Sequence, residues 1–132
     1  MPYQIRKLLP QERSSVEKLR DEYSSDYLLY WDNEFIVAEG EEGIAGAMSY
    51  YFDGRYHQIQ NLLLKKNSPK RLVVRMYDYV EKAILDKGFD KLVSYVENTN
   101  NPLQTYLQRV GFKAYDNNKN GVWFYKTLKK EN

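Results

Sequence analysis

Residues 56–96 read YHQIQNLLLKKNSPKRLVVRMYDYVEKAILDKGFDKLVSYV, and this stretch decides the fold. Residues 56–64 end in three leucines, which is typical of a strand that is buried on both faces. Ser68 and Pro69 predict a helix start, with serine as the N-cap and proline at the first helical position. Apolar residues then recur at helical spacing until a glycine ends the helix, and a second strand follows at 91–96. Strand, helix and strand in this order predict two parallel strands.

The sequence on either side of this unit adds further strands and helices. Residues 35–39 and 44–52 predict a hairpin around a short loop with glycine at both ends. Residues 112–115 and 122–128 predict a second antiparallel pair. The other expected elements are a strand at 3–8, a helix from Pro10, a helix over 103–110 and, unless the first helix simply ends at 24–26, a second short helix to Tyr30. The expected fold is an α/β (α+β) sandwich, whose mixed, mostly antiparallel sheet has helices on both faces and a central parallel pair.

Length and composition restrict the classes of protein that fit. The chain has 132 residues and no internal repeat or linker, so we expect one domain over 1–132. It has no cysteine and a single histidine, His57, which excludes disulfides, cysteine nucleophiles and histidine or thiolate metal clusters. No apolar run approaches the roughly 20 residues that a bilayer requires, and the first residues lack the apolar core of a signal peptide. We therefore expect a soluble, cytoplasmic protein without a membrane partner.

Positive charge is concentrated in one region of the chain. The formal net charge is only +2, and no nucleic-acid-binding signature is present, so no nucleic-acid partner is expected. No acidic residue occurs between Asp53 and Asp78, but that interval holds six cations: Arg55, Lys65, Lys66, Lys70, Arg71 and Arg75. Four of them crowd the predicted helix start, where the helix dipole disfavours cations. Either a phosphate-bearing ligand compensates them there, or their side chains simply point to solvent.

Two segments resemble the GNAT N-acetyltransferases. Residues 85–96 are similar to that family's helix end and following strand, and residues 100–112, NNPLQTYLQRVGF, are similar to its asparagine-to-Gly-Phe helix segment. The order of the predicted elements matches over most of the chain. The resemblance implies a GNAT-like sheet splayed at its parallel pair, and an acyl-CoA-dependent N-acetyltransferase that acts on a small amine or peptide amine by direct attack. The absence of cysteine and of a serine elbow agrees with a reaction without a covalent enzyme intermediate.

The resemblance also implies acetyl-CoA as co-substrate. In this family the pyrophosphate lies on a glycine-rich turn at a helix start, which falls here on residues 68–73, and the pantetheine arm pairs with the preceding strand. The implied cofactor-binding residues are Leu63, Leu64, Lys70, Arg71, Leu72, Val73 and Asn100, with the N–H groups of Leu72 and Val73 facing the pyrophosphate. Residues 68–73 contain none of the family's glycines. Asn100 equally suits an asparagine turn before Pro102.

Three residues are candidates for acid or base catalysis. The family often uses a tyrosine as the acid for the leaving thiolate, and its position falls on Leu107. Tyr106 is one residue away, about 100° around the helix, and is the candidate acid, unless it packs at the sheet edge. His57, which titrates near neutrality, is a candidate base or a surface residue. Glu97 is a second candidate base that could instead cap a helix or pair with Lys91.

Aromatic residues gather where this fold usually walls its acceptor pocket. Tyr23, Tyr27, Tyr30 and Trp31 lie among several carboxylates, which would favour a cationic acceptor held by cation–π contact, or they are ordinary packing. Because the glycine loop is missing, the alternative function is a non-catalytic GNAT-fold binding or interaction module. The last strand is also a candidate for pairing between two copies of the chain in a homodimer.

Overall fold

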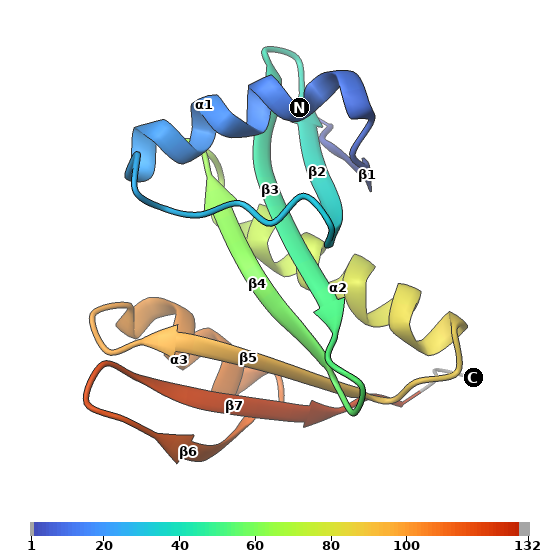
Figure 1. The fold of residues 1–132 in the computed structure, drawn as a ribbon, viewed down its shortest axis with the longest axis vertical. Helices are drawn as coiled ribbons and strands as arrows, with labels where there is room; N and C mark the ends of the chain where they lie inside the picture. Colours follow the sequence, from blue (N-terminus) through green and yellow to red (C-terminus); the bar gives the residue numbers. More distant parts are fainter. Residues whose placement is uncertain (1, 130–132) are drawn as a thin grey trace. The chain divides into compact units, whose positions relative to one another are not determined.

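The computed structural model describes residues 2–129, which form seven strands and four helical segments (Figure 1). In chain order these are β1 (Gln4–Lys7), the 3-10 helix η1 (Pro10–Glu12), α1 (Arg13–Tyr23), β2 (Glu34–Gly40), β3 (Gly43–Phe52), β4 (His57–Leu64), α2 (Arg71–Asp86), β5 (Lys91–Glu97), α3 (Asn101–Arg109), β6 (Lys113–Asn117) and β7 (Gly121–Thr127). Residues 24–33 contain no helix, so of the two alternatives the first helix simply ends before them, and the second short helix is wrong.

The strands form a single mixed sheet in the order β1-β2-β3-β4-β5-β7-β6. Strands β4 and β5 are parallel and pair His57 with Leu92 and Ile59 with Ser94. The pairs β1–β2, β2–β3, β5–β7 and β6–β7 are antiparallel. These pairings confirm the predicted fold class, including both hairpins and the central parallel pair.

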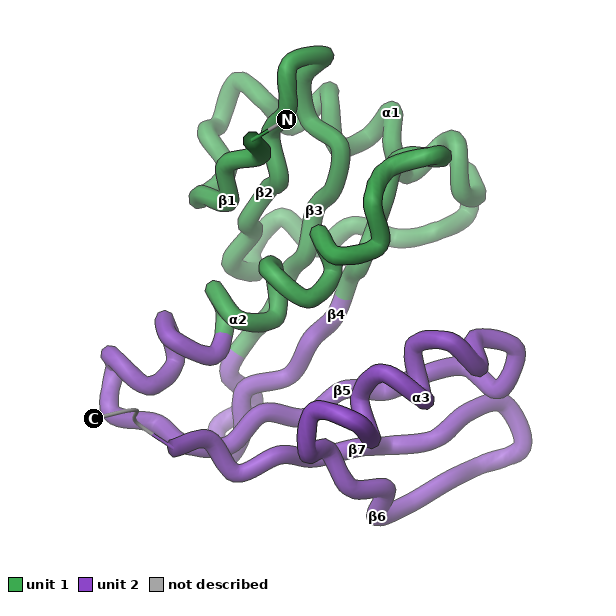
Figure 2. Tube along the Cα trace, turned by 180° about the vertical axis from the view of Figure 1, so that it is seen from behind, with its two compact units in different colours: residues 1–51, 61–80 green, residues 52–60, 81–132 purple. Residues whose placement is uncertain are grey.

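The chain divides into two compact units (Figure 2). Of the described residues, 2–51 and 61–80 belong to the first unit, and 52–60 and 81–129 belong to the second. Strand β4 and helix α2 each contribute to both units, and the expectation of one domain stays a prediction. Among residues 2–129, no helix has the length and apolar character needed to cross a membrane.

The first unit is built on alternation along its strands. Val16 and Leu19 of α1 pack in one cluster with side chains of β2, β3 and β4, namely Phe35, Val37, Ala47 and Leu63. Alternate positions face the opposite side of the sheet, where a Cβ added at Gly46 would lie 3.2 Å from the Met76 methyl of α2. Figure 2 shows α2 on the face opposite α1. Because successive side chains of a strand face opposite sides of the sheet, this unit has apolar packing on both faces, against α1 on one and against α2 on the other.

Both Gly-Phe dipeptides of the second unit end a helix in the same way. Gly88 and Gly111 adopt positive φ angles of 88° and 102°. The N–H groups of the phenylalanines that follow them donate back to the carbonyls of Ile84 and Leu107, at 3.1 and 2.9 Å. These are Schellman caps, which need a left-handed residue that glycine supplies without strain. In this unit Leu92 of β5, Leu107 of α3, Phe124 of β7 and Phe112, which follows α3, are buried, whereas all residues of β6 are exposed.

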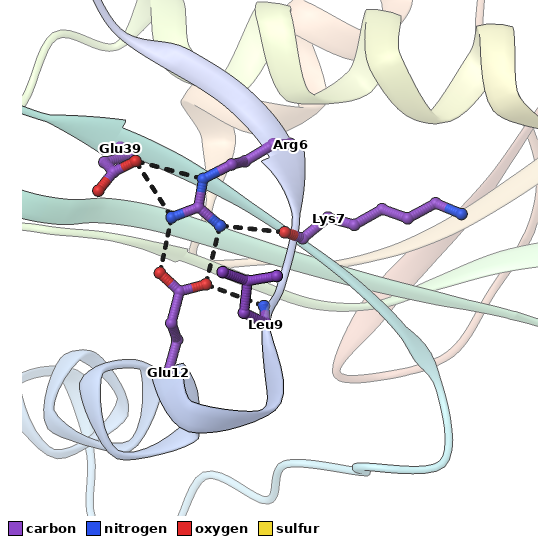
Figure 3. Close-up of polar contacts among 5 residues, drawn as sticks. All are labelled: Arg6, Lys7, Leu9, Glu12 and Glu39. Atoms are coloured by element: carbon purple, nitrogen blue, oxygen red, sulfur yellow. Dashed lines mark hydrogen bonds and ion pairs between the residues drawn. The ribbon is translucent and has the colours of Figure 1, made fainter.

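An arginine joins three elements of the first unit (Figure 3). The guanidinium of Arg6, on β1, donates to both carboxylate oxygens of Glu12 at 2.8 and 2.6 Å and to Glu39 of β2 at 3.1 Å. The Leu9 N–H also donates to Glu12, at 2.8 Å. The hydrogen bonds from Arg6 hold the pKa of the Glu12 carboxyl below its ordinary value. This network fixes the turn η1 against the sheet.

Replacing Glu12 with glutamine should therefore destabilise the fold by about 1 kcal/mol at neutral pH, because the bidentate, charge-assisted pair is lost. The pKa of Glu12 is lower in the folded than in the unfolded chain, so its contribution is complete above the unfolded value of 4.5 and is lost as the pH falls through the folded value. Urea unfolding of Glu12→Gln and wild type at pH 7 and pH 3 measures this. A difference that does not shrink at pH 3 would contradict the assignment.

Candidate functional site

The chain leaves β4 through a tight turn at Lys65–Ser68. The Ser68 N–H donates to the Lys65 carbonyl at 3.0 Å, and Asn67 adopts a φ of 70°. Asparagine is one of the few residues that tolerate this left-handed conformation. The Lys65 N–H donates to the Ala45 carbonyl of β3 at 2.7 Å, which ties the start of the turn to the sheet.

Helix α2 begins at Arg71, two residues later than the sequence predicts. The N–H groups of Leu72 and Val73 donate to the carbonyls of Pro69 and Lys70, at 3.1 and 3.0 Å, in a tight first turn. We expected these two N–H groups to face a pyrophosphate, but internal hydrogen bonds already use them. Among residues 2–129, the N–H groups of Lys70 and Arg71 have no acceptor, so they are the donors that this helix start presents.

The turn and the helix start carry four cations: Lys65, Lys66, Lys70 and Arg71. None of them forms an ion pair within the described part of the chain, and the first turn of α2 contains no acidic residue. Beside the turn lies a groove of about 500 Å³, which Lys65, Lys66 and Ser68 line from one side and Glu41 and Glu42 from the other. The helix start is therefore a region of positive charge that no ion pair within the described residues neutralises, although two carboxylates line the same groove.

The edge of β4 that faces away from β3 carries the outward backbone groups of alternate residues. The N–H groups of Asn61 and Lys65 point to β3, where they meet the Ser49 hydroxyl at 3.1 Å and the Ala45 carbonyl at 2.7 Å. Because strand residues alternate, the N–H and carbonyl groups of Leu62 and Leu64 point to the opposite edge. The Leu63 carbonyl instead lies 3.3 Å from the Cβ position of Gly46 on β3. Of the two leucines that we expected to pair with pantetheine, only Leu64 presents its backbone to this edge.

Two residues of the segment 24–30 form hydrogen bonds with Asn61 and Leu62 of β4. The side-chain amide of the buried Asn61 donates to the Leu28 carbonyl at 2.9 Å, and the Ser49 hydroxyl donates to Asn61 Oδ1 at 2.7 Å. The Leu62 N–H donates to the Tyr27 hydroxyl at 3.3 Å. The sequence did not predict these contacts, because the two segments are more than 30 positions apart and no local pattern relates them.

The four aromatic residues expected to wall an acceptor pocket do not form one cluster. Tyr23 contacts Tyr27 with ring centroids 5.1 Å apart, but Tyr23 is 64% exposed and Tyr30 is 45% exposed. Trp31 packs on Phe35 at 4.8 Å, a contact within the core of the first unit. Tyr27 is thus the member of this group that reaches β4.

His57 lies in a packed aromatic cluster of the second unit and is not a surface residue. It is buried, and its ring lies 5.0 Å from that of Phe52 and 4.9 Å from that of Phe89. Burial, together with the nearby charge of Lys87, lowers the pKa of His57. Burial contradicts the surface-residue alternative, and the role of His57 as a catalytic base stays a prediction.

The other candidates of the second unit lie on or beside α3. Asn100 caps this helix, because its side-chain oxygen accepts the Leu103 N–H at 3.2 Å, as in the asparagine-turn alternative. Glu97 does not pair with Lys91, whose ammonium donates instead to Thr127 at 2.9 Å. Tyr106 is half-buried beside the fully buried Leu107. Within residues 2–129, no group of three or more potential ligands is placed to hold a metal ion.

Comparison with known proteins identifies the fold. No protein-family model and no curated protein matches the sequence. Among solved structures, the PaiA N-acetyltransferase of Thermoplasma acidophilum, in complex with coenzyme A, superposes with a TM-score of 0.81 at 18% identity, over 97% of this chain and 100% of that chain. A Bacillus anthracis protein assigned as a streptothricin acetyltransferase, in complex with acetyl coenzyme A, has a TM-score of 0.82 at 12% identity, over 98% of this chain and 100% of its own.

One longer protein and further single-domain-sized proteins share the fold as well. The N-acetylglutamate synthase of Neisseria gonorrhoeae, complexed with coenzyme A and N-acetylglutamate, has a TM-score of 0.80 at 14% identity, and the match spans 98% of this chain but 36% of that one. Acetyltransferases of the GNAT family from Desulfovibrio desulfuricans and Staphylococcus aureus superpose with TM-scores of 0.78 and 0.77. With its parallel β4–β5 pair at the centre of a seven-stranded mixed sheet, this chain has the fold of the GNAT N-acetyltransferases.

Proposed function

We propose that the protein is an acetyl-CoA-dependent N-acetyltransferase that transfers an acetyl group to a small amine or a peptide amine. The observation that carries this proposal is the start of α2, where Lys65, Lys66, Lys70 and Arg71 meet the positive end of the helix dipole, form no ion pair within the described chain and have no acidic residue in the first turn. A pyrophosphate would reverse the sign of this otherwise unfavourable arrangement. Similar folds crystallised with coenzyme A or acetyl coenzyme A support the same ligand.

In this proposal the cations replace the glycine loop. Lys70 and Arg71 contact the pyrophosphate through their side chains and their N–H groups, which have no other acceptor among residues 2–129. The pantetheine amides pair with the exposed edge of β4 at Leu64. The N–H groups of Leu72 and Val73 donate within the first helical turn and not to the pyrophosphate, and the Leu72 side chain is buried.

The proposed reaction is direct attack. The nitrogen lone pair of the amine forms a C–N bond with the thioester carbonyl carbon, and the C–S bond breaks. The leaving thiolate takes a proton from the Tyr106 hydroxyl, and the proton lost from the amine nitrogen, carried by water, restores that hydroxyl. Replacing Tyr106 with phenylalanine should lower kcat while leaving the affinity for acetyl-CoA unchanged.

Two measurements on the intact chain test the function. Calorimetry with acetyl-CoA should show binding at micromolar concentrations, and release of coenzyme A thiol should be detected with at least one member of a panel of small amines and peptide amines. Binding without turnover across the panel would argue against the catalytic part of the proposal. Absence of binding would overturn it and favour the alternative, a GNAT-fold interaction module.

A further inference from the structure

The Leu62 N–H has an unusual partner for a strand amide. It points away from β3, and it donates to a phenol hydroxyl from a segment 35 positions earlier in the chain, at 3.3 Å. Edge amides of strands are ordinarily satisfied by another strand or by water. Here the Tyr27 hydroxyl is the acceptor, and it lies on the edge of β4 that faces away from β3, next to Leu62 and two residues from Leu64.

Surrounding contacts hold the main chain at Tyr27 independently of this hydrogen bond. Its N–H donates to the Ser24 carbonyl at 3.0 Å, and its carbonyl accepts from the Arg20 guanidinium at 3.0 Å. The next residue, Leu28, is fastened by the side chain of the buried Asn61 at 2.9 Å. The N···O distance of 3.3 Å from Leu62 is at the long end for an N–H donor, so this bond is weaker than the contacts that anchor the segment.

We infer that Tyr27 is a positioning residue for the acyl group, and this inference rests on the proposed function. A pantetheine arm that pairs with Leu64 meets the next outward-facing N–H of β4 at Leu62, because outward positions recur every second residue. The phenol oxygen of Tyr27 stands in the free protein where the thioester carbonyl oxygen stands in the complex. On binding, the Tyr27 side chain turns aside while its main chain stays in place, and the Leu62 N–H donates to the thioester carbonyl instead of to the hydroxyl.

This exchange serves the chemistry of acyl transfer. As the amine attacks, negative charge develops on the carbonyl oxygen, and a donor already aimed at that oxygen stabilises the transition state. Tyr27 keeps the Leu62 N–H satisfied and correctly oriented before the co-substrate arrives. Because the Tyr27 hydroxyl already accepts the Leu62 N–H, binding of acetyl-CoA must first break this hydrogen bond, which weakens the affinity.

Replacing Tyr27 with phenylalanine removes this competing acceptor and keeps the ring. Acetyl-CoA should then bind about two- to fivefold more tightly, because the variant breaks no protein hydrogen bond on binding. Coenzyme A, which has no carbonyl at this position, should bind the variant and the wild type equally. Tyr30→Phe is the matched control, since Tyr30 is an exposed tyrosine of the same segment, and it should change neither affinity.

A second measurement follows the amide itself. Hydrogen exchange of the Leu62 N–H in the free protein should be faster in Tyr27→Phe than in the wild type, and acetyl-CoA should protect this N–H in both. Equal hydrogen-exchange rates in the two proteins would overturn the proposed change of hydrogen-bond partner. Tighter binding of coenzyme A as well as acetyl-CoA by the variant would also overturn it. Unchanged or weaker binding of acetyl-CoA by the variant would do the same. If the wild type binds neither ligand, the proposed function fails and this inference fails with it. If the wild type binds acetyl-CoA and Tyr27→Phe does not bind it more tightly, only the inference fails.

Discussion

Reversing the charges of Lys70 and Arg71 to glutamate should weaken acetyl-CoA binding by about 100-fold. Each cation at the start of α2 can make a charge-assisted contact with the pyrophosphate, worth roughly tenfold in affinity, and reversal adds repulsion. The same substitutions place acidic residues in the first helical turn, where the dipole favours them. The double variant should therefore be at least as stable as the wild type, and a loss of affinity would not reflect unfolding.

The control variant has the same change in net charge, but its substitutions lie away from the start of α2. Lys18 of α1 and Lys82 of α2 are exposed, and Lys18→Glu with Lys82→Glu alters the formal charge by the same amount. Calorimetry at two salt concentrations should show a steep salt dependence for the wild type and the control, and a shallow one for Lys70→Glu with Arg71→Glu. Equal affinities of the two double variants would mean that only the overall charge matters, and the helix start would lose its assigned role.

The sequence predicted the elements whose signals are local. The parallel pair follows from one strand-helix-strand unit, and the hairpin of β2 and β3 follows from alternating segments around a short loop with glycine at both ends. The ends of α2 and α3 follow from Gly88 and Gly111, because a left-handed cap is determined by the residue that must adopt it. The sequence offered the asparagine turn at Asn100 as one alternative for the same reason, since its partner Leu103 is three positions away.

The site was harder to predict because its details depend on contacts between distant segments. Ser68 and Pro69 give a strong local signal for a helix start, but the turn at Asn67 and the tight first turn delay α2 to Arg71. Because of this delay, the N–H groups of Leu72 and Val73 form internal hydrogen bonds, and those of Lys70 and Arg71 are the ones left for a ligand. The interpretation of His57 as a surface residue was wrong for a related reason. Phe52 and Phe89, which enclose it, come from two different segments.

The largest effect on stability is expected from adding one methyl group at Gly121. This residue lies opposite Glu97 on β5, and a Cβ at its position would lie 2.6 Å from the Val96 carbonyl oxygen and 2.6 Å from the Tyr95 ring. A side chain can turn aside, but the carbonyl belongs to the neighbouring strand and can move only with the pairing itself. Gly121→Ala should therefore destabilise the protein by about 3 kcal/mol.

Gly40 offers a matched comparison for this argument. A Cβ there would also approach a neighbour at 2.6 Å, but the atoms that it meets belong only to the Tyr3 side chain, which can rotate away. Gly40→Ala should cost less than about 1 kcal/mol, since the reduced entropy of the unfolded chain partly offsets the repacking. Urea unfolding of both variants measures the contrast. Similar losses at the two glycines would show that the backbone near Gly121 yields as easily as a side chain, and that the β5–β7 pairing is not the rigid part of the second unit.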